Sequence, residues 1–200
     1  MPYARFKPLE QMRFKLPPGM HVRPRDFDEI AIIQLISLTG GLLAGYMLAS
    51  GRGILVLVPG LLIMMPGFLE MMGNISGTMA ARLSSGLFLG AVKPTITNQS
   101  MLRGNVIGAV ALSAIVSLFL GLVAFAINWI FFGAFYPNII LVAIFAGLLA
   151  NAIEIPLTIF STFWLFKHGH DPNNIMGPYL TVVGDMVSVT SLLIAIAVLI

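Results

Sequence analysis

The chain has 200 residues, of which 58% are hydrophobic and only 10% are charged, with a mean hydropathy of +0.96. A soluble domain carries about a quarter charged residues, so this composition excludes a soluble globular protein and predicts a polytopic membrane protein. The net charge of +3 does not indicate nucleic-acid binding, because the basic residues gather at one set of predicted loops. The absence of cysteine excludes disulfides, thiolate metal sites and thiol catalysis.

The N-terminal part of the sequence predicts a tail followed by a first span. Residues 1–28 are polar, basic and rich in proline, and we interpret them as a cytoplasmic tail. Residues 29–200 are then one transmembrane domain whose first span covers about residues 30–49. Gly41 and Gly45 stand four residues apart in this span, a spacing that permits close packing of helices.

The second predicted span is irregular. It begins near Ile54, and Pro59 and Pro66, each followed by glycine, interrupt it. Proline removes a backbone donor from the helical ladder, and the freed carbonyl is tolerated in a membrane only against protein or a wet cavity. Broken helices of this kind often build ion sites. We therefore expect this span to line a polar path.

Three more spans follow in the sequence. Residues 93–103 read as a polar loop, and the next apolar stretches cover about residues 105–132, 139–166 and 179–200. Stretches of about 20 apolar residues or more are long enough to cross a bilayer. The predicted fold is all-α with five transmembrane helices, the second of them broken.

The distribution of basic residues predicts the orientation of this domain. With five spans and a cytoplasmic N-terminus, the inner segments hold ten of the eleven lysines and arginines, and only Arg52 lies outside. Basic residues are enriched in cytoplasmic loops. We expect a multi-pass protein of the cell membrane with its C-terminus outside.

Asp185 is the only charged residue of the last predicted span. An ionised carboxylate at membrane depth costs several kcal/mol unless it is paired, hydrated or bound to a cation. One interpretation is a cation ligand on a transport path, with Ser188 on the next turn; the other is a hydrogen bond or ion pair between helices. Because the span holds no partner charge, the sequence favours the cation ligand.

Two glutamates are further candidates at membrane depth. Glu154 lies three residues after Asn151, on the same helical face, and Glu70 lies between Pro66 and Asn74. They either line the ion path or, for Glu154, form a protonated packing contact. Buried carboxylates are also the usual proton or Na⁺ relay groups in coupled transport.

The candidate ligands are carboxylate, amide and hydroxyl oxygens, which suit Mg²⁺ or Ca²⁺ over zinc or copper. Asn74 offers an amide oxygen for a hard cation or for a hydrogen bond between helices. One aspartate per chain is sparse for a site, whereas two chains on a two-fold axis would present two. His168, His170 and Asp171 resemble a metal cluster, but we interpret them as a solvated loop in which Asp171 caps the last helix.

Two segments carry a resemblance to a known family. The first is the pattern Asp171-Pro172-x-Asn174, Pro178 and Gly184-Asp185. The second is Gly73-Asn74-Ile75-Ser76-Gly77 followed by Ala81-Arg82-Leu83-Ser84-Ser85. Together they resemble the MgtE-type magnesium transporters, especially the solute carrier family 41 branch. This resemblance implies a five-helix domain, a homodimer and a Mg²⁺ path along the two-fold axis. It also implies that the family's essential last-helix aspartate falls on Asp185 and its pore asparagine on Asn74.

The leading hypothesis is therefore a homodimeric channel or carrier for a divalent cation, for which we expect Mg²⁺. The ion would be the transported substrate, bound by Asp185 of both chains, and we expect no other cofactor and no nucleic acid. The alternatives are a Na⁺- or proton-coupled exchanger and a non-transporting membrane subunit. An intramembrane aspartyl protease is remote, because such enzymes need two carboxylates that share a proton and no second aspartate lies in a predicted span.

Overall fold

The structure, a computed structural model, describes residues 24–97 and 99–200. Within these ranges every regular element is a helix. The predicted tail falls mostly on residues 1–23, which lie outside the described residues. The helices, in chain order, are α1 (Pro24–Ser50), α2 (Arg52–Leu57), α3 (Pro59–Phe88), α4 (Ser100–Phe132), α5 (Asn138–Lys167) and α6 (Pro172–Leu199).

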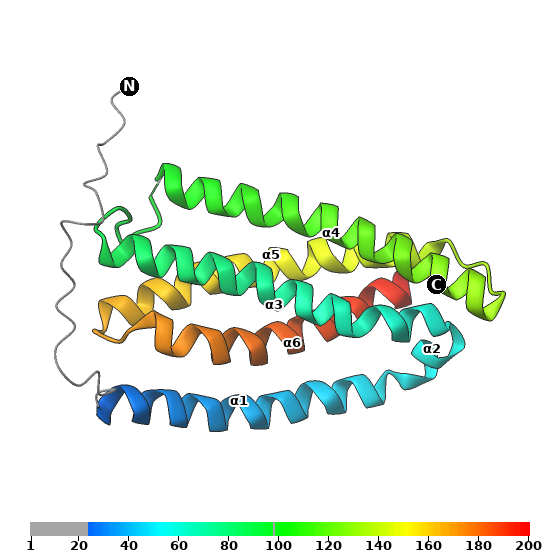
Figure 1. The fold of residues 1–200 in the computed structure, drawn as a ribbon, viewed down its shortest axis with the longest axis horizontal. Coiled ribbons are helices and arrows are strands. Elements are labelled where there is room, and N and C mark those ends of the chain that lie inside the picture. The colour runs from blue at the N-terminus through cyan, green and yellow to red at the C-terminus, as the bar shows by residue number, and fades with distance from the viewer. Residues whose placement is uncertain (1–23, 98) are drawn as a thin grey trace, which may run out of the picture.

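The five long helices lie side by side and alternate in direction (Figure 1). The starts of α1, α4 and α6 and the ends of α3 and α5 gather at one end of the bundle. The short helix α2, the α4–α5 connection and the C-terminus lie at the opposite end. The first and last long helices therefore run in the same direction, as an odd number of passes requires.

The basic residues of the described chain follow these ends. Arg82, Lys93, Arg103 and Lys167 lie near the end where α3 and α5 finish and α4 begins, whereas Arg52 lies on α2 at the other end. The charge asymmetry expected from the sequence is thus present in the folded bundle.

In the described part of the chain, four helices are long and apolar enough to cross a membrane: α4, α5, α6 and the part of α1 from Ile30 to Ser50. These helices make the chain a multi-pass membrane protein. Helix α3 falls outside that group, since it carries Glu70, Asn74 and Arg82 among several glycines. Its 30 residues nevertheless rise about 45 Å, and it packs among α4, α5 and α6. Its length and position therefore match those of a fifth span.

The predicted break in the second span exists, but at one proline only. The chain leaves helical geometry at Val58 (φ −128°, ψ 94°), and Pro59 then occupies the first turn of α3, where its missing N–H costs nothing. Pro66 lies inside the continuous helix α3. Packing against three neighbouring helices holds α3 together there despite the lost backbone hydrogen bond.

Two other boundaries differ from the prediction. Helix α6 begins at Pro172, seven residues before the predicted apolar span, and Asp171 caps it as expected: the Asp171 carboxylate accepts a hydrogen bond from the Asn173 N–H at 2.9 Å. The helix then continues through Pro178. Helix α4 begins at Ser100, inside the stretch expected to be a loop. The Gln99 side chain stabilises the turn before it, because its Oε1 accepts a hydrogen bond from the Lys93 N–H and its Nε2 donates one to the Lys93 carbonyl.

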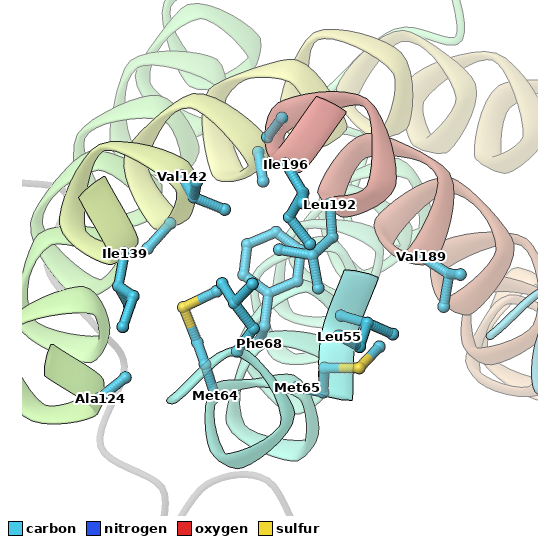
Figure 2. Close-up of a cluster of buried hydrophobic side chains, with 14 of the residues drawn as sticks. Leu55, Met64, Met65, Phe68, Ala124, Ile139, Val142, Val189, Leu192 and Ile196 are labelled. Atoms are coloured by element: carbon cyan, nitrogen blue, oxygen red, sulfur yellow. The ribbon is translucent and has the colours of Figure 1, made fainter. Parts of the chain in front are cut away.

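The helices pack through an apolar core at the α2 end of the bundle. Figure 2 shows Phe68 of α3 directed toward Leu192 and Ile196 of α6, and Met64 belongs to the same cluster. Helices α4 and α5 approach closely where Gly121 faces α5: a Cβ there would lie 2.9 Å from the Ile140 Cα. Close approach at small residues is how helices associate in lipid. The apolar contacts of Phe68 with Leu192 and Ile196 hold α3 beside α6, and the polar site lies between these two helices.

Candidate functional site

Asp185 lies near the midpoint of α6 and is half-buried. Since α6 is 28 residues long, about 42 Å, this position is some 20 Å from either helix end. The sequence placed Asp185 inside the apolar region, and the longer α6 of the structure puts it deeper still.

An open groove of about 530 Å³ runs between α3 and α6 beside Asp185. An added Cβ at Gly73, Gly77 or Gly177 would meet nothing within 4 Å, so these glycines leave the groove unfilled. The groove is lined by Pro66, Leu69, Glu70, Gly73, Asn74 and Gly77 of α3 and by Gly177, Leu180, Thr181 and Asp185 of α6. Three of the five predicted site residues (Asp185, Glu70 and Asn74) thus share one cavity.

Glu70 and Asn74 form a hydrogen-bonded pair on the α3 side of the groove. The Asn74 Nδ2 donates to the Glu70 Oε1 at 3.0 Å, one helical turn away. This bond turns the amide nitrogen toward the glutamate and leaves the amide oxygen for another partner. The groove therefore offers two carboxylates and one amide oxygen, ligands that hard divalent cations accept directly or through water.

The other two predicted residues, Glu154 and Ser188, lie together but elsewhere. Glu154 of α5 has no exposed surface and does not line the groove. Its carboxyl accepts hydrogen bonds from the Ser76 hydroxyl of α3 and, at 3.2 Å, from the Ser188 hydroxyl of α6. The structure thus separates an open carboxylate site from a sealed one behind it. The predicted role of Glu154 and Ser188 as ion ligands stays a prediction.

Asn74 also borders a second, smaller pocket of about 220 Å³ between α3 and α4. Arg82 of α3 and Asn105 and Gly108 of α4 line it too. Asn74 of α3 and Asn105 of α4, each directly after a glycine in the sequence, therefore line the same pocket. Asn74 is the residue of α3 that connects the two hollows.

Helix α5 carries a buried polar stripe along one face: Asn151, Glu154, Thr158 and Thr162. The Asn151 Nδ2 donates to the Ala109 carbonyl of α4 at 3.1 Å, while its Oδ1 has no partner among the described residues. The Thr158 and Thr162 hydroxyls likewise have none in that part of the chain. Of these four side chains, Glu154 alone joins both α3 and α6.

Sequence reasoning missed Ser76 and Thr181. Ser76 was visible as a hydroxyl within an apolar helix, but its partner Glu154 is 78 residues away and sequence spacing gives no sign of the pair. Thr181 lies four residues before Asp185, so the helical period could have assigned it to the same face.

The loop cluster before α6 has mainly local contacts. Asp171 caps the helix as expected, and His168 Nδ1 lies 2.8 Å from the Trp164 carbonyl. No group of three or more histidine, cysteine, aspartate or glutamate residues suited to a metal occurs in residues 24–97 and 99–200. An ion in the groove would therefore rely on two carboxylates and an amide from one chain, supplemented by water or by a second chain.

A bundle of membrane-spanning helices with an open groove that holds two carboxylates and an amide is typical of multi-pass ion-transport proteins. The family model described as MgtE, divalent cation transporter, matches residues 65–195, which is more than half of the chain. The chain therefore belongs to the MgtE family of divalent cation transporters. No curated protein and no solved structure matches it. Because the family is one of transporters, the chain is not an enzyme, and the protease alternative is removed.

Proposed function

We propose that the protein carries Mg²⁺ across the cell membrane through a homodimeric pathway in which Asp185 of both chains holds the ion. The observation that supports this most directly is the position of Asp185. It lies at mid-height of α6 and borders the same groove as Glu70 and Asn74. An acidic residue at this depth is expensive to keep, and a passing cation is what offsets its cost.

The ligand set supports Mg²⁺ as the substrate. Mg²⁺ dehydrates reluctantly, keeps several waters and is held by one or two carboxylates. A groove of about 530 Å³ has room for an ion with its water shell. In our proposal, Asp185 binds this hydrated ion while the Asn74 amide oxygen and the Glu70 carboxylate accept hydrogen bonds from its waters.

A homodimer would complete the site. The groove is open on one side, and the glycines at its edge let a neighbouring helix approach closely. On a two-fold axis, two copies of the groove would face one another and two copies of Asp185 would share one ion. Two carboxylates would balance the charge of a divalent cation.

The direction of transport follows from charge. With the arginine- and lysine-rich end of the bundle in the cytoplasm, the N-terminus is inside and the C-terminus outside. The membrane potential acts on the cation itself. It favours inward movement by about 2.3 kcal/mol per charge per 100 mV, and twice that for a divalent ion.

A coupled exchanger is the second candidate, favoured by the carboxyl groups within the bundle other than Asp185, which are Glu70 and Glu154. A flux that requires a Na⁺ or proton gradient would establish coupling, whereas a flux that follows only Mg²⁺ and voltage would remove it. We also propose, from the two segments quoted in the sequence analysis, that the chain lies in the solute carrier family 41 branch of the family.

The test is Mg²⁺ flux into liposomes that hold purified protein, with wild type beside Asp185→Ala. We expect entry for the wild type and none for the variant, while light scattering shows the same dimer for both. Thr190→Val is a matched control on α6, because the Thr190 hydroxyl bonds its own helix at the Met186 carbonyl and does not line the groove. Normal flux in Asp185→Ala would refute the proposal.

A further inference from the structure

Glu154 does not line the groove, but it contacts both helices that do. It comes from α5, the long helix that packs against α3, α4 and α6 together. Its carboxyl is sealed from solvent between α3 and α6, and both of its oxygens accept a hydroxyl hydrogen bond, one from each of those helices. One side chain of α5 therefore joins the two helices that line the groove.

The two hydrogen bonds meet the groove helices next to its polar residues. On α3, Ser76 lies between Asn74 and Gly77, which both line the groove. On α6, Ser188 lies one turn after Asp185. Gly184, directly before Asp185, packs against the same carboxyl, since a Cβ there would lie 3.7 Å from the Glu154 Oε1. Displacement of Glu154 would therefore move the backbone that carries Asp185 and Asn74.

We propose that Glu154 is a positioning residue that sets the spacing between the two walls of the groove, and with it the fit to the cation. This inference rests on the proposed function of the groove. Glu154 acts through Ser76 and Ser188 and does not touch the ion.

Chemistry distinguishes this role from simple packing. A buried carboxyl group is costly to desolvate, and a leucine of similar size would fill the space at no such cost. The carboxyl supplies two directional contacts at fixed length, which an apolar side chain does not. The two hydrogen bonds of Glu154, which we call the tether, hold α3 and α6 at one separation. Mg²⁺ demands near-ideal geometry, so a fixed separation matters more for Mg²⁺ than for the larger and more tolerant Ca²⁺.

The experiment measures flux and groove width on the same variants. Glu154→Leu removes both contacts, Glu154→Gln keeps an acceptor for one hydroxyl, and Ser76→Ala with Ser188→Ala removes both donors while Glu154 stays. Thr158→Val is the matched control, because Thr158 is buried on α5 one turn after Glu154 and its hydroxyl has no partner among the described residues.

Groove width is read from spin labels on Gly77→Cys and Gly177→Cys. These positions line opposite walls, an added Cβ at either meets nothing within 4 Å, and the chain has no cysteine of its own. The labelled chain is diluted into an excess of unlabelled chain, so that the measured distance lies within one protomer.

We expect Glu154→Leu and the double serine variant to broaden or shift the label distance and to raise KM for Mg²⁺ about tenfold, equivalent to ~1.4 kcal/mol. KM for Ca²⁺ should rise less. Glu154→Gln should have a label distance and a KM for Mg²⁺ closer to those of wild type than Glu154→Leu has. Thr158→Val should match wild type in both quantities. If Glu154→Leu does not fold, the double serine variant and Glu154→Gln still decide the question.

Two results would overturn the positioning role. One is an unchanged distance and KM in the double serine variant. The other is complete loss of flux in Glu154→Gln at an unchanged distance, which would make Glu154 a participant in ion or proton transfer. Absence of flux in the wild type would instead refute the proposed function, and the label distances would then test the tether alone.

Discussion

Asp185 and Glu154 are both acidic residues in the middle of adjacent helices, yet the bundle gives them opposite surroundings. Asp185 borders an open groove whose glycines leave space beside it. Glu154 has no exposed surface and is bonded to two hydroxyl groups. The comparison teaches that the role of an acidic residue in a membrane helix depends on the side chains of neighbouring helices, because they decide whether an ion, water or a hydroxyl group reaches the carboxyl.

The largest expected effect is on transport when the open carboxylate loses its charge. Asp185→Asn keeps the size of the side chain and removes its charge. We therefore expect Mg²⁺ flux to fall by about tenfold to a hundredfold, which corresponds to the loss of a charged interaction of ~1.5–3 kcal/mol. Liposome flux measures it. Flux within twofold of wild type would show that the two carboxyl groups do not differ in the way proposed.

The free energy of unfolding should depend more on Glu154 than on Asp185. Glu154→Ala leaves two buried hydroxyls without their acceptor and opens a cavity, so we expect it to lower the free energy of unfolding by about 2–4 kcal/mol. Asp185→Ala, at a half-buried position, should change it by less than about 1 kcal/mol. Thermal unfolding of both variants in the same detergent tests the difference. Equal destabilisation by the two variants would contradict the distinction between an open and a sealed site.

An intermediate effect is expected on the α3 side of the groove. Glu70→Gln and Asn74→Ala each remove one oxygen ligand or its hydrogen-bond partner, so we expect about a threefold to tenfold loss of Mg²⁺ flux, less than for Asp185→Asn. Because the two side chains bond to each other, the double variant should cost less than the product of the single effects. Strictly multiplicative losses would argue that the pair does not act as a unit.

The smallest effect concerns single hydroxyls of α6. Ser188→Ala removes one of two donors to Glu154 and should lower stability by about 1 kcal/mol. Thr190→Val should leave it within about 0.5 kcal/mol of wild type, since the Thr190 hydroxyl bonds only its own helix in the described part of the chain. The same thermal unfolding assay compares them, and an equal loss for both variants would remove the special role of Ser188.

The site was predictable in parts. Asp185, Glu70 and Asn74 stood out because polar residues within apolar spans are costly and therefore rare. Glu154 stood out for the same reason, but its sealed position did not follow from the sequence. The pairing of Glu154 with Ser76 and Ser188 joins three helices, and hydrogen bonds between helices have no signature in local spacing.

The sequence by itself determined the membrane class, the helical fold, the presence of five long helices, the bounds of α5 to within one residue, and the charge asymmetry between the two ends. The length of the apolar segments and the position of the basic loops can be read from the sequence. The first decides which segments can span the bilayer, and the second predicts their orientation. The start of α6 differs most, since the helix begins at Pro172, seven residues before the predicted apolar run.

The tertiary structure decided which acidic residues meet. Packing of α3 against α6 places Asp185 beside Glu70 and Asn74, and packing of both helices on α5 seals Glu154 behind them. Helical periodicity fixes which residues share a face, but not which neighbouring helix that face contacts. That choice depends on small residues and close contacts across the whole bundle, and it divides four similar polar positions between an open groove and a closed core.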